Sequence, residues 1–151
     1  MNEAADRIGK ALQDHDQALA VAESLTGGML ASEFARASGS SAWFRGGVVA
    51  YSRHVKHQVL DVPPGPVVSA EAAAAMAAGV VKLTDADVAV AVTGVGGPDE
   101  QDGQPPGTVW LATWPETLGP PVKLHFEGEP GDICAQACAR AVDILAERLG
   151  L

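Results

Sequence analysis

The stretch QALAVAESLTGG, residues 17–28, contains the features that decide the fold. Its first part is an apolar run of strand length, which a polar turn from Glu23 to Gly28 interrupts. Helical spacing of apolar residues returns from Met29 to Ala37, so the stretch predicts a strand, a polar turn and a helix in succession. This succession is typical of α/β proteins, whose ligands bind beside such turns.

The same alternation extends along the chain in both directions. Helices are predicted over 3–14, 29–37, 52–60, 69–83 and 132–149, and strands over 17–22, 48–51, 87–93, 107–114 and 122–126. Residues 38–47 are expected to form a loop. The order favours an α/β fold: a three-layer α/β/α sandwich around a mixed, mostly parallel five-stranded sheet. The polar loops after the first three strands are expected to converge at one edge of this sheet.

Composition limits the classes of partner. The chain has 151 residues, 47% of them hydrophobic, which suits a single domain spanning 1–151. Its net charge of −9 disfavours nucleic acid and anionic membrane surfaces, and a small anionic ligand would need locally placed amides or cations. The N-terminal segment lacks a signal-peptide pattern and no apolar run approaches membrane-spanning length, which predicts a cytoplasmic protein.

The two cysteines, Cys134 and Cys138, are too few for a disulfide framework. They lie four residues apart in a predicted helix, where small apolar residues on a buried face are the usual reading. A metal site would need more ligands nearby, and only His125 lies near them in sequence, so no metal site is predicted.

Ser24 stands between the end of a strand and the Gly27-Gly28 start of a helix, which places its hydroxyl at the ligand edge of the sheet. The amides of Thr26, Gly27 and Gly28 are expected to be unpaired donors, able to hold an oxyanion or a phosphate. The alternative is that Ser24 or Thr26 caps the helix and the glycines only allow close packing.

Lys56 follows Tyr51 at a distance that puts it about one turn inside the next helix. If that turn faces the ligand edge, Lys56 approaches Ser24, and a desolvated lysine amine can accept a serine proton. The alternative is a solvated lysine beside a core tyrosine.

A glycine-rich segment, TGVGGPD at 93–99, follows the third strand. Thr93, Gly94, Gly96, Gly97 and the later Thr108 are predicted to form a ligand wall or a flexible lid. Pro98 and a polar stretch follow instead of a helix, so this is not a dinucleotide-binding loop. An ordinary wide connection between strands is the alternative.

Several motifs occur in order over nearly the whole chain: AESLTGG (22–28), GSSAWF (39–44), GGVVAYS (46–52), Lys56 with LDV (60–62), VS (68–69), TGVGGPD (93–99) and GTVW (107–110). Together they resemble the CinA C-terminal domain family, which includes nicotinamide-nucleotide amidohydrolases (NMN deamidases). The resemblance implies a standalone form of this domain, a fold similar to anticodon-binding domains and one antiparallel strand in the sheet.

The resemblance also implies an activity: hydrolysis of the carboxamide of nicotinamide mononucleotide to nicotinate mononucleotide and ammonia, without a metal or cofactor. The family's nucleophilic serine falls on Ser24, its tyrosine on Tyr51 and its lysine on Lys56. Trp43 or Phe44 could stack on the pyridine ring, although both could equally belong to the core. A homodimer is expected from the resemblance and from the alanine-rich helix over 70–83.

The sequence departs from the family pattern at several charged positions. Gln104, Pro130 and Cys134 stand where the family often has basic residues, and Arg53 stands where it commonly has Asn. We therefore hypothesise that phosphate binding is weakened, or rebuilt around Arg45, Arg53 or backbone amides. A Ser–Lys hydrolase for another small amide, or a noncatalytic ligand-binding member of the family, are the alternatives.

Overall fold

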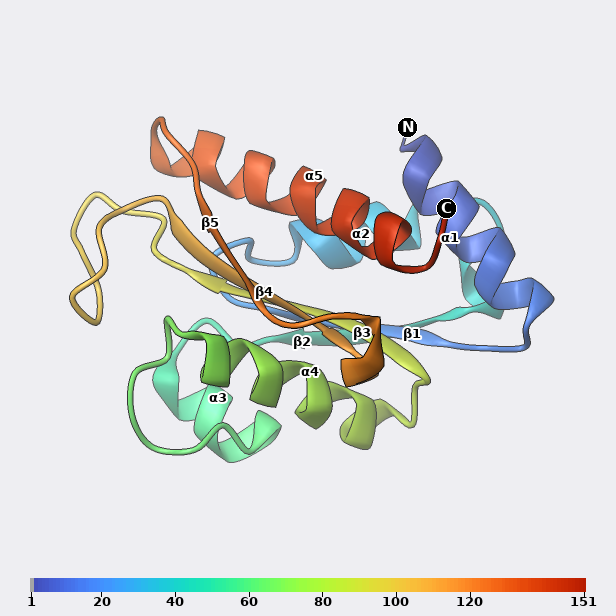
Figure 1. The fold of residues 1–151 in the computed structure, drawn as a ribbon, viewed down its shortest axis with the longest axis horizontal. Helices are drawn as coiled ribbons and strands as arrows, with labels where there is room; N and C mark the ends of the chain where they lie inside the picture. The colour runs from blue at the N-terminus through green and yellow to red at the C-terminus, as the bar shows by residue number, and fades with distance from the viewer. Residues whose placement is uncertain (1) are drawn as a thin grey trace.

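The computed structural model describes residues 2–151, in which two helical layers enclose one sheet (Figure 1). The elements are α1 (Glu3–Asp14), β1 (Leu19–Glu23), α2 (Met29–Ala35), β2 (Phe44–Val49), α3 (Arg53–Leu60), α4 (Ala70–Thr84), β3 (Val88–Gly94), β4 (Thr108–Trp114), β5 (Val122–His125) and α5 (Pro130–Arg148). Helices α1, α2 and α5 cover one face of the sheet, and α3 and α4 cover the other. The predicted three-layer α/β/α architecture is confirmed.

The five strands lie in the order β2-β1-β3-β4-β5. Strand β1 is parallel to both β2 and β3, whereas β4 is antiparallel to both β3 and β5. Strand β4 therefore runs against the other four, as the resemblance implies. Because β1 and β2 are parallel neighbours, the turns that follow them reach the same edge of the sheet.

The two faces of the sheet carry side chains of different size. Leu19, Val21, Val88, Val90 and Val92 pack against α1, α2 and α5. Ala20, Ala22, Ala89 and Ala91 pack against α3 and α4. Small residues let these helices lie close to the sheet and to each other: a Cβ on Gly79 of α4 would lie 2.2 Å from the Leu60 carbonyl oxygen of α3.

Strand β2 differs from its prediction. It begins at Phe44, inside the stretch expected to be a loop, and ends at Val49, before Tyr51. Two glycines, Gly46 and Gly47, weaken the strand pattern in the sequence. The sheet favours glycine at 47, because a Cβ there would lie 2.0 Å from the Val21 carbonyl oxygen of the neighbouring strand.

Within residues 2–151, none of the helices combines the length and apolar character that crossing a membrane requires.

Candidate active site

Ser24 and Lys56 meet at the edge of the sheet where β1 and β2 end. The Lys56 Nζ atom donates a hydrogen bond of 3.0 Å to Ser24 Oγ. Both residues are buried, with 2% of Lys56 and 6% of Ser24 exposed. Helix α3 begins directly after β2, capped by the Ser52 hydroxyl on the amide of Val55, and this start places Lys56 beneath Ser24. The structure thus brings together the two side chains that the sequence analysis paired.

Burial changes the acid–base behaviour of Lys56. It lowers the pKa of the amine from an ordinary 10.5 to about 8, with a further decrease from Arg53 and an opposing effect of Asp102. Within residues 2–151, Ser24 Oγ is the hydrogen-bond partner found for this amine, whereas an ammonium group offers three donors. A lysine with this pKa is neutral in a substantial fraction of molecules near pH 8 and can accept a proton from a hydroxyl.

The carboxylate of Glu23, the last residue of β1, is fully buried and holds the turn that carries Ser24. It accepts hydrogen bonds from the Thr26 hydroxyl (2.6 Å) and the Gly28 amide (3.2 Å). It also accepts from the amides of Leu30 (2.9 Å) and Ala31 (3.0 Å) in α2. A negative charge at this position also complements the helix dipole. The sequence analysis missed this role, although a carboxylate just before a helix start was a usable signal.

The expectation that Thr26, Gly27 and Gly28 offer free donors is therefore wrong in part. Glu23 occupies the Thr26 hydroxyl and the Gly28 amide, while the Gly27 amide donates to the Ser24 carbonyl at 3.1 Å. The amides of Leu25 and Thr26 have no hydrogen-bond partner in the described part of the chain. These two amides are therefore the donors of this turn that remain free in the described structure.

Cys134, in the first turns of α5, contacts the same turn. Its thiol donates to the Leu25 carbonyl oxygen at 3.0 Å. Burial raises the pKa of this thiol, so it stays protonated and able to donate at neutral pH. Cys134 is partly exposed and Cys138 is buried, so the expected burial is met in full only by Cys138.

A cavity of about 350 Å³ opens above Ser24. It is lined by the turn after β1, by the segment from Gly94 to Gln101, by Tyr51, and by Pro130 and Cys134 of α5. Gly94, Gly96 and Gly97 thus form part of a cavity wall. The volume lies within the range of small-molecule sites.

Tyr51 lies at the rim of this cavity rather than in the core. It is 72% exposed, and its hydroxyl has no hydrogen-bond partner among residues 2–151. In the described structure, Tyr51 therefore makes no hydrogen bond to the Ser24–Lys56 pair. The position leaves the hydroxyl free to meet a molecule that enters the cavity.

Two threonines expected at the ligand wall lie beneath it instead. Thr93 is fully buried, and its hydroxyl donates to the Val67 carbonyl oxygen at 2.6 Å. Thr108 is 2% exposed, and its carbonyl oxygen accepts from the Val95 amide. Both support the segments around the cavity without lining it.

The two arginines expected near a phosphate are not free in the cavity. Arg45 lies near the start of β2, at the opposite end of the sheet, because Phe44 pairs with Leu19 and Val49 pairs with Glu23. Arg53 is bound to the carboxylate of Asp102. The charged residues that line the cavity in the described structure are Asp99 and Glu100.

Trp43 and Phe44 are also far from a stacking position. Trp43 is 1% exposed and packs edge-on against Phe34, with ring centroids 6.2 Å apart. Phe44 packs against the same cluster at the start of β2. Trp43 belongs to the core and the partly buried Phe44 packs against it, which agrees with the alternative reading.

The comparison with known proteins decides the family. A sequence model of the CinA C-terminal domain matches residues 1–149 of the 151. The chain belongs to the CinA C-terminal domain family. A CinA-like protein of Citrifermentans bemidjiense is 37% identical over 150 residues, which cover 95% of this chain. The match covers only 36% of that protein, so the chain spans about a third of the length of this CinA relative.

Solved structures of CinA superfamily proteins share the fold. One from Klebsiella pneumoniae is 33% identical, has a TM-score of 0.91, and the match covers 99% of both chains. One from Escherichia coli is also 33% identical, with a TM-score of 0.88 over 94% of this chain and 86% of that one. The CinA fold therefore extends along essentially the whole chain.

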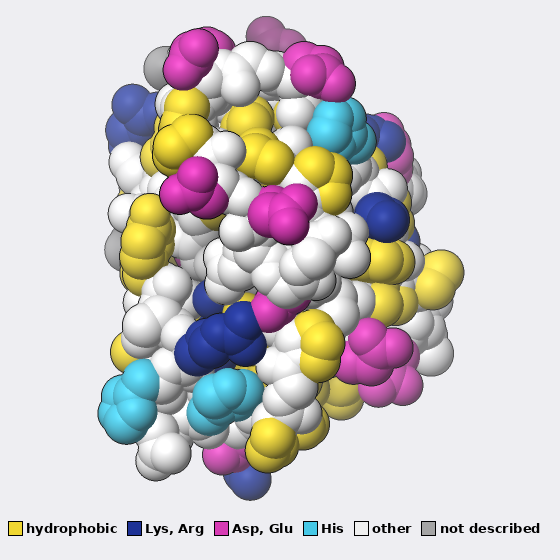
Figure 2. Space-filling model, turned by 90° about the vertical axis from the view of Figure 1, so that its left-hand side faces the viewer, with side chains coloured by type: hydrophobic (Ala, Val, Ile, Leu, Met, Phe, Trp, Pro, Cys, Tyr) yellow, Lys and Arg dark blue, Asp and Glu magenta, His cyan; other side chains and the backbone are white. Residues whose placement is uncertain are grey.

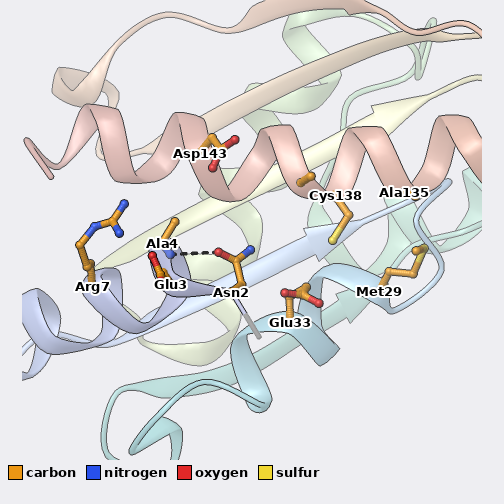
Figure 3. Close-up of a pocket in the computed structure, with 10 residues that line it drawn as sticks. Asn2, Glu3, Ala4, Arg7, Met29, Glu33, Ala135, Cys138 and Asp143 are labelled. Carbon is orange, nitrogen blue, oxygen red and sulfur yellow. Dashed lines mark hydrogen bonds between the residues drawn. The ribbon is translucent and has the colours of Figure 1, made fainter.

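This CinA domain has a second, larger cavity of about 680 Å³ between α1, α2 and α5 (Figure 3). Arg7, Glu33, Cys138 and Asp143 are among the residues that line it. No group of three or more His, Cys, Asp or Glu residues in the described chain is placed to hold a metal ion. The second cavity lies apart from Ser24 and Lys56, which makes the smaller cavity the candidate active site.

Proposed function

We propose that the chain is an amidohydrolase that cleaves a linear carboxamide by a Ser–Lys mechanism. The substrate implied by the family resemblance is nicotinamide mononucleotide, which would yield nicotinate mononucleotide and ammonia. The observation that carries the proposal is the 3.0 Å hydrogen bond between Lys56 Nζ and Ser24 Oγ beneath a cavity. Hydrogen-bond contact between a nucleophile and a base is the required geometry for such catalysis.

In the proposed acylation step, neutral Lys56 takes the proton from Ser24 Oγ as this oxygen attacks the carboxamide carbon. The amides of Leu25 and Thr26 stabilise the tetrahedral oxyanion; a single such donor typically contributes about 2.7–4 kcal/mol. Collapse of the intermediate breaks the C–N bond, and Lys56 passes the proton to the departing ammonia.

In the proposed deacylation step, Lys56 is neutral again and takes a proton from a water molecule, which attacks the acyl-enzyme ester. The C–O bond to Ser24 breaks, Lys56 returns the proton to Ser24 Oγ, and the carboxylate product leaves. Tyr51 at the cavity rim orients the entering amide through its free hydroxyl.

The experiment measures ammonia release from nicotinamide mononucleotide by the wild type and by Ser24→Ala and Lys56→Met. We expect release by the wild type and a loss of at least about a thousandfold in kcat for each variant. Equal release by wild type and Ser24→Ala would eliminate Ser24 as the nucleophile.

A second candidate function is hydrolysis of a different small amide. It is favoured by the acidic side chains Asp99 and Glu100 at the cavity and by Gln104, Pro130 and Cys134 at positions where the family often has cations. A panel of unphosphorylated pyridine and aliphatic carboxamides tests it. Binding without ammonia release from any of these amides would instead indicate the noncatalytic, ligand-binding alternative.

Two further proposals concern the setting of this activity. We propose a cytoplasmic enzyme and a homodimer, the latter from the family resemblance and the alanine-rich α4. Sedimentation velocity of the purified chain tests the dimer: a single species with the mass of one chain would contradict it.

A further inference from the structure

The wall of the candidate active site is formed mainly by the connection between β3 and β4. The cavity is lined by Gly94 at the end of β3 and by residues 95–101 of this connection. At its tip, Gln101 and Gln104 exchange two backbone hydrogen bonds, of 3.1 and 2.8 Å, and so form a tight turn. This turn presents the side chain of Asp102 toward the rest of the protein rather than toward solvent.

Asp102 ties this turn to two other segments. One carboxylate oxygen accepts hydrogen bonds from the amides of Val67 (2.8 Å) and Val68 (3.1 Å), and the other accepts from the guanidinium of Arg53. Only 9% of the Asp102 side chain is exposed. Arg53 also donates to the Gly65 carbonyl oxygen at 3.4 Å. The cavity wall, the segment before α4 and the start of α3 are thus joined at one carboxylate.

Figure 2 shows the end of the molecule that carries this connection. Basic and acidic side chains touch near the middle of this face, and other acidic groups lie above them. The ion pair between Arg53 and Asp102 is partly accessible to solvent, because 48% of the Arg53 side chain is exposed. A half-exposed ion pair alone contributes little to stability, but the two backbone amides add bonds that a surface pair lacks.

The same pair lies beside the proposed catalytic base. Arg53 begins α3, and Lys56 stands one helical turn further along the same helix. Arg53 lowers the pKa of Lys56 and Asp102 raises it, so the two charges oppose each other at the amine. His54 and His57 share the helix, while Glu23 on β1 is bound to the start of α2.

We propose that Asp102 is a positioning residue, which fixes the cavity wall against α3 and offsets the charge of Arg53 beside Lys56. This inference rests on the proposed function, because it assigns Asp102 a role through Lys56 and the cavity. Asp102 does not touch the reacting atoms; it acts through Arg53, Val67 and Val68.

The test is the pKa of the Lys56 amine, measured by NMR of a protein with isotope-labelled lysine side chains. The chain has only four lysines, Lys10, Lys56, Lys82 and Lys123, and Lys56 is the buried one. Asp102→Asn leaves Arg53 unopposed and should lower the midpoint by at least about half a pH unit. Arg53→Gln leaves Asp102 unopposed and should raise it, and the double variant should return it close to the wild-type value.

The control is Asp61→Asn, which removes an exposed carboxylate at the far end of α3. Asp61 has a left-handed backbone with φ of 57°, which Asn tolerates, so the fold is preserved. This variant should leave the Lys56 titration unchanged. Shifts in the same direction for Asp102→Asn and Arg53→Gln, or no shift in either, would overturn the proposed role.

Activity supplies the second readout. Asp102→Asn should raise KM for the carboxamide more than it lowers kcat at high pH, because the wall loosens while the Ser24–Lys56 pair stays intact. Hydrogen exchange should also increase over residues 95–107; unchanged exchange and unchanged KM would contradict the wall-fixing role. If the opposite NMR shifts occur but the wild type releases no ammonia from any amide, the proposed function fails and the charge balance at Lys56 stands.

Discussion

Lys56 combines two properties that are rarely found in one lysine: nearly complete burial and a single hydroxyl as its hydrogen-bond partner in the described structure. Burial disfavours the ammonium form, and the resulting pKa of about 8 makes the amine a base near physiological pH. A catalytic base works best when its pKa lies near the working pH. Because an ammonium group is unfavourable in a buried site, this arrangement lowers the free energy of unfolding of the chain.

The pH dependence of catalysis follows from the same residue. Only neutral Lys56 accepts the Ser24 proton, so kcat/KM should rise about tenfold per pH unit below pH 8 and level off above it. The measurement is initial ammonia release between about pH 6 and pH 9.5. A flat profile over this range would show that Lys56 is not the base.

The Lys56 amine should lower the stability of the folded chain although the proposed activity requires it. The pKa of about 8 in the folded chain lies below the ordinary 10.5, so the unfolded chain binds more protons between these values and stability rises with pH in that window. Lys56→Met should therefore raise the free energy of unfolding at pH 7 by about 1–3 kcal/mol, while abolishing activity.

Urea unfolding at pH 7 and at about pH 10 measures this effect. The gain from Lys56→Met should shrink at the higher pH, because the amine is then neutral in the folded chain and the unfolded chain has begun to lose its proton. Lys82→Met, at an exposed position of α4, is the matched control and should change stability little at either pH. A destabilised Lys56→Met at pH 7 would contradict the prediction.

At the scale of elements, α2 depends on a carboxylate that lies outside it. Helix α2 is short, with seven residues, and its N-cap residue Gly28 has no side chain with which to cap it. Glu23 supplies the missing acceptor from the end of β1 and thereby joins the strand, the turn that carries Ser24 and the helix. Short helices draw most of their stability from such tertiary contacts.

Glu23→Gln should lower the free energy of unfolding by about 2–3 kcal/mol, because an amide NH₂ group would face backbone donors in a buried site. It should also lower kcat, since the turn that carries Ser24 loses its anchor. The matched control is Glu33→Gln in the same helix, whose surface ion pair with Arg36 contributes less than about 1 kcal/mol. Equal effects of the two substitutions in urea unfolding would contradict the role of Glu23.

The elements also show which parts of the site were predictable. The unit of β1, turn and α2 was predictable from its periodicity, and parallel pairing of β1 with β2 then places Ser24 near the start of α3. Strand β2 was not, because Gly46 and Gly47 resemble a loop. Arg45 was expected near a phosphate, whereas the strand register carries it to the far end of the sheet. Sequence patterns do not give such registers when glycines replace the alternating side chains.

Long-range polar contacts formed the other unpredictable part. The hydrogen bonds between Arg53 and Asp102 and between Cys134 and Leu25 join segments that are distant in sequence. No local sequence pattern predicts such contacts. Local propensity describes elements, whereas these contacts depend on how the elements assemble.

At the scale of the whole molecule, charge bears on the choice of substrate. The net charge is −9, and the charged residues lining the described cavity are acidic, so a phosphate meets no cation there. A hydrogen-bonded ion pair to phosphate typically contributes about 1.5–3 kcal/mol, or more than tenfold in affinity. We therefore expect kcat/KM for nicotinamide mononucleotide to exceed that for its unphosphorylated riboside by less than about tenfold.

A cation placed in the cavity should increase the preference for nicotinamide mononucleotide over its unphosphorylated riboside. Cys134→Arg puts a guanidinium on the cavity wall and should raise the ratio of the two kcat/KM values by roughly tenfold. Ala135→Arg, one residue further along α5 and facing the larger cavity, is the matched control and should leave the ratio unchanged. A strong preference of the wild-type protein for the mononucleotide over the riboside would contradict the hypothesis of weakened phosphate binding.

The unequal side chains on the two faces of the sheet have a consequence for variation. Ala89 is fully buried in the alanine face that meets α3 and α4, so the two methyl groups added by Ala89→Val should overpack it, and a library screened for folding should reject this substitution. On the opposite face, Val90 packs among larger and more adaptable neighbours, and Val90→Ile should survive the same screen. The face of the sheet that packs against α3 and α4 should thus tolerate few substitutions during evolution, whereas the opposite face should tolerate more.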